Sequence, residues 1–350
     1  MVVTRRWTCA ATPPSARISN VGLTRYGAND MVLAAAAENN IGGKSMTNQP
    51  ALNARATTIE ELEIVLGKFF DETKFALGLA FKPQPGDIII APYSKCGTTW
   101  LQQIAHGLRT RGSMEFDDIY DVIPWIETAY DFGWDLDAPQ VAKPRVFKSH
   151  ISWHNIPKGA RYIVSFRHYY DAIVSSYRFS EGWMFEPGTI SLEALTRWEF
   201  PRDKADSRGY WFHLNSWWEQ RHNPDVLLLC YEDMKADLPG TIRKVARFMN
   251  IKLDDELLAI VARQSTLEFM LAHSHKFDEH NLHAIGGKRA GLPPPIDNSK
   301  VTAGAPKDAR YQLSPTLKAE LDDIWREQVT PKYGFKNYEE LRLALRELPE

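Results

Sequence analysis

The sequence feature that most constrains the fold is a short apolar run that leads through a glycine-containing loop into an amphipathic segment. The run Asp87–Pro92 reads Asp-Ile-Ile-Ile-Ala-Pro, and its length and β-branched side chains predict a strand. After the loop, apolar residues recur at the i, i+3, i+4, i+7 spacing of one helix face, at Leu101, Ile104, Ala105 and Leu108. The sequence therefore predicts a strand, a loop and a helix in immediate succession.

Further apolar runs predict three more strands, at Arg145–Ser149, Arg161–Phe166 and Val226–Cys230. Helical spacing of apolar residues predicts helices at about 62–70, 170–177, 209–221, 242–249, 314–327 and 338–348. Strands that alternate with amphipathic helices are typical of an α/β three-layer sandwich, in which helices cover both faces of a central, mostly parallel sheet. We therefore expect this fold class.

Composition narrows the classes of function. The chain has 42 basic and 44 acidic residues and a formal charge of −2, so no basic excess attracts nucleic acid or an anionic membrane. The three cysteines are too few and too scattered for a disulfide framework, which favours a reducing compartment. No apolar run approaches the roughly 18 residues of a membrane span. We expect a soluble, cytoplasmic protein without nucleic-acid or membrane partners.

Two regions differ from the globular pattern. Residues 1–45 carry five basic and two acidic side chains among small polar residues, which predicts either a disordered extension or a targeting segment. Residues 59–350 are expected to form a single domain, in which residues 273–311 form a lid-like loop. The four histidines of this loop fit no standard zinc spacing, so we expect no metal site; they are His273, His275, His280 and His283.

The loop Tyr93–Trp100 has the composition of an anion-binding site. In an open parallel sheet, ligands bind where strands end, and the start of a helix offers unpaired N–H groups and a positive dipole. Gly97 allows close approach of an anion to the backbone, and Lys95 adds a full positive charge. The Walker A pattern places its lysine after a second glycine, whereas Lys95 precedes the only glycine, so an ordinary nucleotide triphosphatase is disfavoured.

The segment Ser94–Leu101 closely resembles the 5′-phosphosulfate loop of the cytosolic-type sulfotransferases, whose usual form is Tyr-Pro-Lys-Ser-Gly-Thr-Thr-Trp. Ser94 replaces the usual proline, and Cys96 replaces a serine, which exchanges a hydroxyl for a weaker thiol donor. The resemblance implies 3′-phosphoadenosine 5′-phosphosulfate (PAPS) as co-substrate and adenosine 3′,5′-bisphosphate (PAP) as product. It assigns to donor binding the residues Lys95, Cys96, Gly97, Thr98, Thr99 and Trp100.

Two further segments match the same family. Arg167 at a strand end and Ser175 eight residues later correspond to its 3′-phosphate ligands, and a guanidinium fork suits phosphate oxygens. The Lys148-Ser-His150 segment resembles the family's catalytic strand end. The resemblance makes His150 the catalytic base, with Lys95 and Lys148 stabilising charge at the reacting centre.

Weaker matches lie towards the C-terminus. The segment after Gln264 resembles the family stretch that touches adenine, which assigns Ser265, Thr266 and Leu267 to donor binding. Tyr231–Lys235 resembles a family segment that we interpret as core and scaffold. For the segment that closes over the 3′-phosphate, Lys288–Gly291 competes with Lys300 and Gly304, and spacing favours the latter pair.

The expected reaction is in-line transfer of a sulfuryl group from PAPS to a hydroxyl or amine of a small acceptor. Six aromatic residues suggest an aromatic or apolar acceptor: Trp125, Tyr130, Phe132, Trp134, Trp153 and Trp183. The protein is expected to be a monomer or a homodimer. Two alternatives remain open, namely an ATP-dependent phosphotransferase and a non-catalytic nucleotide-binding protein.

Overall fold

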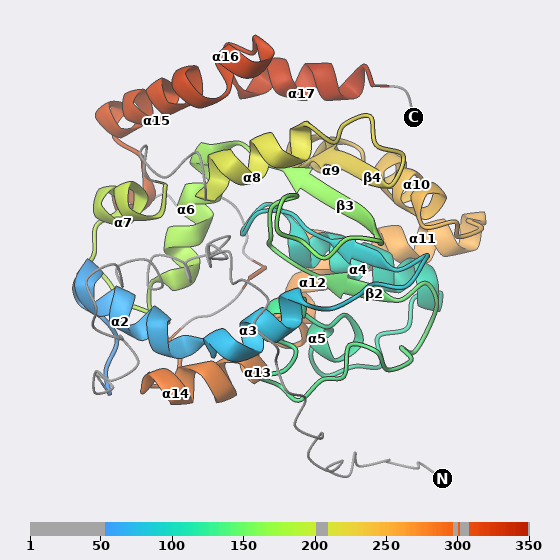
Figure 1. Ribbon diagram of the computed structural model, residues 1–350, viewed down its shortest axis with the longest axis horizontal. Helices are drawn as coiled ribbons and strands as arrows, with labels where there is room; N and C mark the ends of the chain where they lie inside the picture. The colour runs from blue at the N-terminus through green and yellow to red at the C-terminus, as the bar shows by residue number, and fades with distance from the viewer. Residues whose placement is uncertain (1–52, 201–208, 297–299, 302–307, 349–350) are drawn as a thin grey trace, which may run out of the picture.

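The computed structural model describes residues 53–200, 209–296, 300–301 and 308–348 (Figure 1). The predicted extension at 1–45 lies outside the described residues, as does Gly304. Within the described part of the chain, no helix combines the length and the apolar character needed to cross a membrane.

Four parallel strands form the central sheet: β1 (Ile88–Ile90), β2 (Val146–Lys148), β3 (Arg161–Phe166) and β4 (Val226–Cys230). Their spatial order is β2-β1-β3-β4, so β1 pairs with β2 on one side and with β3 on the other. The order in which strands are added therefore reverses next to β1, because β2 lies on one side of it and β3 and β4 lie on the other. Such a switch point leaves a crevice at the carboxyl ends of the strands, where ligands bind in open α/β sheets.

The predicted helices are present, with short additional ones between them. Those that precede the lid-like region are α2 (Ile59–Phe69), α3 (Glu72–Leu79), α4 (Thr98–Thr110), α5 (Ile119–Val122), α6 (Tyr169–Ser180), α7 (Leu192–Glu199), α8 (Gly209–Trp218), α9 (Tyr231–Ala236), α10 (Leu238–Phe248), α11 (Asp255–Gln264) and α12 (Leu267–Ala272). The last are α15 (Pro315–Gln328), α16 (Thr330–Tyr333) and α17 (Tyr338–Arg346), which run along one edge of the molecule in Figure 1.

Local sequence explains where several helices begin. Thr58, Ser191, Ser314 and Asn337 each precede a helix, and each side chain accepts a hydrogen bond from a backbone N–H of the first turn. Helix α4 differs, because its N-cap is Gly97 and no side chain caps it. The first N–H groups of α4 therefore face the crevice without a side-chain acceptor.

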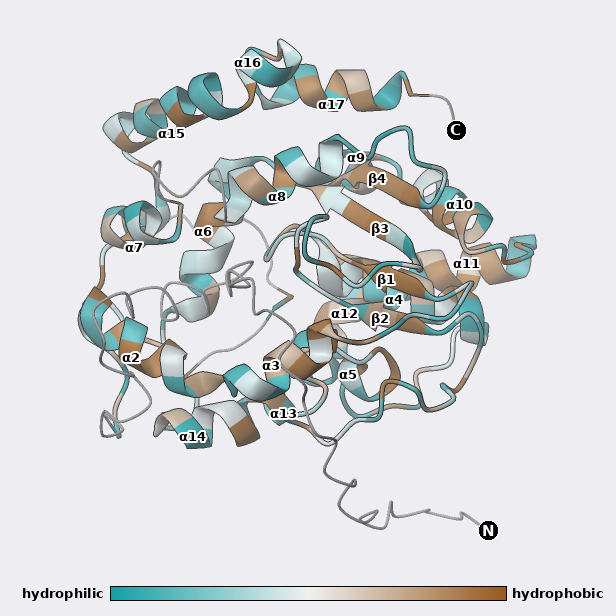
Figure 2. Ribbon diagram, in the orientation of Figure 1, coloured by the Kyte–Doolittle hydropathy of each residue, from teal (hydrophilic) through white to brown (hydrophobic). Residues whose placement is uncertain are grey.

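The sheet is covered by helices, and most of its residues are apolar and buried. Helix α4 contacts β1 and β2 and also packs against α10 and α11. Trp217 of α8 packs against Tyr162 of β3, with ring centroids 5.4 Å apart. The isoleucines of β1 are all fully buried, which explains why this strand reads as a continuous apolar run (Figure 2).

The described part of the predicted lid-like loop is mostly helical. It contains η4 (Ser274–Lys276), α13 (His280–Leu282), the π-helical turn η5 (His283–Gly287), α14 (Lys288–Ala290) and η6 (Ala309–Tyr311). Helix α14 packs against α2, and Arg289 forms an ion pair with Asp131 at 2.8 Å. A lid function for this region stays a prediction.

A buried ion pair joins the starts of β1 and β2 and gives the first testable prediction. Asp87 accepts two hydrogen bonds from Arg145, of 2.9 and 2.6 Å, and both side chains are buried. Replacing Asp87 with Ala leaves the guanidinium buried without its partner, so we expect a loss of about 3–5 kcal/mol in the free energy of unfolding. Urea denaturation measures this loss.

The control is Glu256→Gln, because Glu256 pairs with Arg111 at the surface. Solvent screens such a pair, so this variant should unfold like the wild type. A loss below about 1 kcal/mol for Asp87→Ala would show that the buried pair is not a support of the sheet.

Candidate active site

The loop between β1 and α4 adopts a backbone that its glycine makes possible. Lys95 and Gly97 both have positive φ, of 63° and 100°. A Cβ atom at Gly97 would lie 3.0 Å from the Tyr231 ring and 3.4 Å from Ser165 Oγ. The loop is held from β3, because Ser165 Oγ donates a hydrogen bond to the carbonyl of Cys96, and Arg167 Nη1 donates one of 2.7 Å to that of Lys95.

Cys96 lies inside this loop and is a neutral thiol. Its side chain is fully buried, and burial raises the pKa of the thiol to about 12. Exchange of the usual serine for cysteine therefore leaves a weak donor and adds no negative charge beside the anion site.

An aromatic group lies against the loop. Trp100 Nε1 donates a 2.8 Å hydrogen bond to the Ser265 carbonyl, and the Trp100 ring meets Tyr231 edge-on at 5.5 Å. The guanidinium of Arg167 lies over the Tyr231 ring at 4.5 Å. The sequence predicts that Tyr231 belongs to a scaffold segment, whereas the structure places its ring beside the anion loop. The resemblance of Tyr231–Lys235 to a family segment is the sequence signal for this residue.

Three buried polar atoms around the loop have no hydrogen-bond partner among the described residues. They are Thr98 Oγ1, Arg167 Nε and Ser265 Oγ. Buried polar atoms are nearly always paired in folded proteins, so this group indicates a place for a polar ligand. The other two residues of the predicted adenine segment are used differently: the Thr266 hydroxyl caps α12, and Leu267 is exposed.

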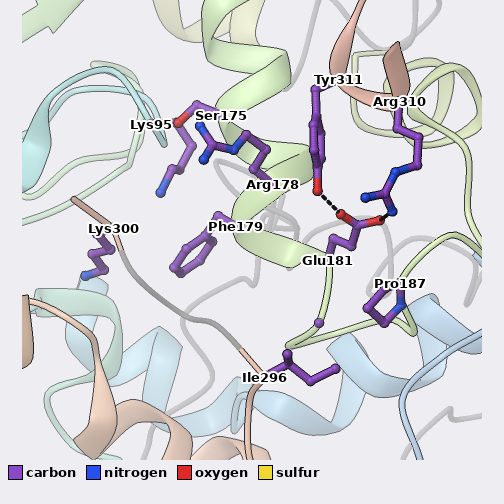
Figure 3. Close-up of a pocket in the computed structure, with 11 residues that line it drawn as sticks. Lys95, Ser175, Arg178, Phe179, Glu181, Pro187, Ile296, Lys300, Arg310 and Tyr311 are labelled. Carbon is purple, nitrogen blue, oxygen red and sulfur yellow. Dashed lines mark hydrogen bonds and ion pairs between the residues drawn. The ribbon is translucent and has the colours of Figure 1, made fainter. Parts of the chain in front are cut away.

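A cavity of about 240 Å³ opens beside the loop (Figure 3). Lys95, Ser175 and Lys300, which were predicted from three separate segments, all line it. Its wall has four cationic side chains, Lys95, Arg178, Lys300 and Arg310, and one carboxylate, Glu181, which accepts a hydrogen bond from Tyr311 and pairs with Arg310. The excess of positive charge suits an anionic ligand.

Lys95 is the cation of this cavity that belongs to the loop itself. Its ammonium lies over the Phe179 ring, 3.9 Å from the centroid. Burial, and then the charge of Lys300, lower the pKa of Lys95 to about 7. An anion bound in the cavity would favour the protonated form and so raise this pKa again.

His150 lies just beyond the end of β2 and is held at both its backbone and its ring. Its backbone N–H donates to Glu127 Oε1 at 2.7 Å, and its Nδ1 lies 2.7 Å from the carbonyl oxygen of Pro92. A carbonyl only accepts, so Nδ1 carries the proton and the Nε2 lone pair is left to accept one. Burial and the charge of Lys148 hold the pKa of His150 well below its usual value.

Lys148 is buried at the end of β2, beneath aromatic rings. Its ammonium lies 3.6 Å from the Trp125 ring centroid and donates to the Tyr120 hydroxyl at 2.5 Å. Lys300 donates to the same hydroxyl at 2.6 Å, and Glu279 forms ion pairs with both lysines. Tyr120 and Glu279 were missed from the sequence, since nothing in their spacing connects them to Lys148.

The two candidate closing segments end up in different places. Lys300 reaches the cavity and the Lys148 site, whereas the Arg289 side chain of Lys288–Gly291 points to Asp131 and to the carbonyl of Phe69. Among the described residues, no three or more His, Cys, Asp or Glu side chains are arranged to hold a metal ion.

Comparison with solved structures identifies the fold. The fold is that of mouse sulfotransferase SULT7A1 complexed with PAP, which aligns with a TM-score of 0.55 and 20% identity over 79% of this chain and 93% of that one. Retinol dehydratase in complex with retinol and PAP aligns with a TM-score of 0.57 and 16% identity, covering 74% and 85%. The predicted α/β fold class is confirmed.

The family follows from sequence. Residues 85–332 match the model of the sulfotransferase domain, so the chain belongs to this family, as predicted. Sulfotransferase 2A1 of Rattus norvegicus is 33% identical over 193 residues, which cover 53% of this chain and 66% of the relative. Sulfotransferase 1C2 of Homo sapiens is 30% identical over 205 residues, covering 55% and 68%. The matches thus span about two thirds of these relatives.

The close fit at Gly97 gives a second prediction. Gly97→Ala should lower the free energy of unfolding, because it combines a positive φ with a contact against Tyr231. Gly86→Ala is the matched control, since Gly86 has φ 91° and open space around its Cα. The control bears only the backbone penalty of about 1–3 kcal/mol, and Gly97→Ala should exceed it by about 1 kcal/mol or more. Equal losses in urea denaturation would contradict the tight fit.

Proposed function

We propose that this protein transfers a sulfuryl group from PAPS to a hydroxyl or amine of a small acceptor, and releases PAP. The observation that carries the proposal is the set of buried, unpartnered polar atoms of Thr98, Arg167 and Ser265 around the loop. Beside them lies a cavity rich in cations. A ligand with two anionic groups and a polar base suits both features, and both structural neighbours are complexes with PAP.

The donor would be held by groups of different kinds. The N–H groups at the start of α4 and the Lys95 ammonium suit the phosphosulfate, because both offer positive charge at the loop. Arg167 and Ser175 suit the 3′-phosphate, and Trp100 and Tyr231 offer rings for the adenine. These assignments combine the family resemblance with the positions of the side chains.

His150 is the proposed base. With Nδ1–H donated to Pro92, Nε2 accepts the proton of the acceptor hydroxyl or amine. The lowered pKa keeps the imidazole in its neutral, proton-accepting form at neutral pH. The acceptor atom forms a bond to sulfur as the bond from sulfur to the bridging oxygen breaks, and Lys95 and Lys148 stabilise the charge left on that oxygen.

Aromatic side chains would form the acceptor wall. Trp125 meets the His150 ring edge-on at 5.5 Å, and Phe132 stacks on Trp134 with centroids 4.5 Å apart. Tyr120 joins these pairs, since it contacts both Trp125 and Trp134. We therefore propose a flat or apolar acceptor. Trp153 does not belong to this wall, because it packs against Tyr162 and Trp217 at the sheet.

Ligand binding tests the class of donor. Calorimetry should show PAP binding more tightly than ADP with magnesium, because the site has separate groups for two phosphates and lacks the Walker lysine. Transfer of labelled sulfate from PAPS to a panel of phenols, alcohols and amines should follow. Tighter binding of ADP would favour a phosphotransferase, and PAP binding without transfer to any acceptor would favour a non-catalytic nucleotide-binding protein.

A variant of His150 tests the base. His150→Ala should lower kcat by about 10²–10⁴-fold, the usual contribution of a positioned general base, while PAP affinity changes little. His154→Ala is the control, since His154 lies four residues further along and is exposed. Full sulfuryl transfer by His150→Ala would show that another group removes the proton.

A cytoplasmic location and a monomeric or homodimeric state of this protein stay predictions.

A further inference from the structure

A buried cluster of four polar side chains adjoins the cavity, which one of its members, Lys300, lines. It consists of Tyr120 from α5, Lys148 from the end of β2, Glu279 from just before α13, and Lys300, and we call it the Glu279 cluster. Tyr120, Lys148 and Glu279 are each less than 5% exposed. Segments far apart in sequence therefore meet at one point beside the proposed catalytic lysine.

The Tyr120 hydroxyl is satisfied in every direction. It accepts from Lys148 Nζ and from Lys300 Nζ, and it donates its own proton to Glu279 Oε1. A phenol has one proton to give and two lone pairs, so this arrangement uses all of its hydrogen-bonding capacity. Burial and the charge of Glu279 raise the pKa of Tyr120 well above its usual value, which keeps the phenol protonated.

Glu279 is the carboxylate that both lysines face. Its Oε1 lies 3.7 Å from Lys148 Nζ, and it forms a closer ion pair with Lys300. Burial raises the pKa of this carboxyl, but the charges of Lys300 and Lys148 outweigh burial and bring it to about 2. The other charged groups that act on the cluster are Lys95 from the loop, Glu127 from η3 (Ile126–Thr128) and Asp118 before α5.

The backbone at Glu279 supports a specific role for the side chain. Glu279 has φ 61°, in the left-handed region, which glutamate rarely adopts and which disfavours a residue with a long side chain. Such conformations persist where the surrounding structure imposes them, and they concentrate at functional sites. Here the unusual backbone points the carboxylate at two lysines.

We propose that Glu279 is a positioning residue for sulfuryl transfer: its carboxylate, bridged by Tyr120, holds Lys148 and Lys300 as paired ammonium ions beside the cavity. The inference rests on the proposed function. Two buried ammonium ions that share one hydroxyl repel each other, and a carboxylate between them offsets this repulsion. Lys300 then acts beside the sulfuryl group as a second cation, in addition to Lys148.

The test is the pH dependence of single-turnover transfer by Glu279→Gln. Burial and the charge of Lys300 lower the pKa of Lys148, whereas the charge of Glu279 raises it. Removing the carboxylate therefore lowers this pKa further, so the variant should lose activity at lower pH than the wild type. The alkaline limb of its profile should move to lower pH by one pH unit for each unit by which the pKa falls. Glu279→Asp keeps the charge, tolerates the left-handed backbone, and should retain the wild-type profile.

Glu256→Gln is the matched control, because it removes an exposed carboxylate that pairs with Arg111 at the surface. If Glu279→Gln does not fold, Tyr120→Phe serves as the second test. It removes only the bridging hydroxyl and should also shift the alkaline limb of the pH profile to lower pH. An unshifted limb in the variant that folds would overturn the proposal. So would faster transfer by Glu279→Gln, which would mean that Glu279 competes with the donor for the lysines.

Two different outcomes separate the proposed function from the role of Glu279. A wild-type protein that binds PAP but transfers no sulfuryl group to any acceptor would overturn the proposed function, and this inference with it. A wild type that transfers the group while Glu279→Gln keeps its pH profile would overturn the role of Glu279 alone.

Discussion

The pairing of β1 between β2 and β3 is the interaction on which the site depends. Hydrogen bonds of one short buried strand to both neighbours bring three strand ends together. From these ends come Lys95 on the loop after β1, Lys148 on β2 and Arg167 after β3. Parallel strands that end at the same edge thereby bring together cationic residues from three separate segments of the chain. The ion pair of Asp87 with Arg145 supports the opposite ends of β1 and β2.

Positive charge is the second organising constraint, because a site for a polyanion must hold cations close together before the anion arrives. The protein does so by several routes. Lys95 lies over an aromatic ring with a lowered pKa, and Lys148 shares a tyrosine hydroxyl and a carboxylate with Lys300. Each arrangement reduces the repulsion between neighbouring ammonium groups, which would otherwise destabilise the folded protein when no anion is bound.

Much of the framework could be predicted from sequence, because it follows from local patterns. The strand Arg161–Phe166 has the predicted bounds, β1 and β2 are shorter than expected by residues at their ends, and the loop with Gly97 lies where the strand-to-helix pattern placed it. The motif residues Lys95, Ser175 and Lys300 meet at one cavity. Tyr120 and Glu279 could not be predicted, since their mutual hydrogen bond spans 159 positions and depends on tertiary packing that no sequence periodicity records. The packing of Tyr231 against the loop was missed for the same reason, although its segment had been noticed.

The hydrogen bond between His150 and the carbonyl of Pro92 links the proposed base to the loop that is proposed to hold the donor. Pro92 lies shortly after β1, just before the loop with Lys95 and Gly97. The imidazole is therefore hydrogen-bonded to the same stretch of chain that would bind the donor. If that stretch moved on donor binding, the hydrogen bond would couple the His150 imidazole, the proposed base, to the movement. In the proposed reaction, this hydrogen bond would help to keep the imidazole in a constant position relative to the donor.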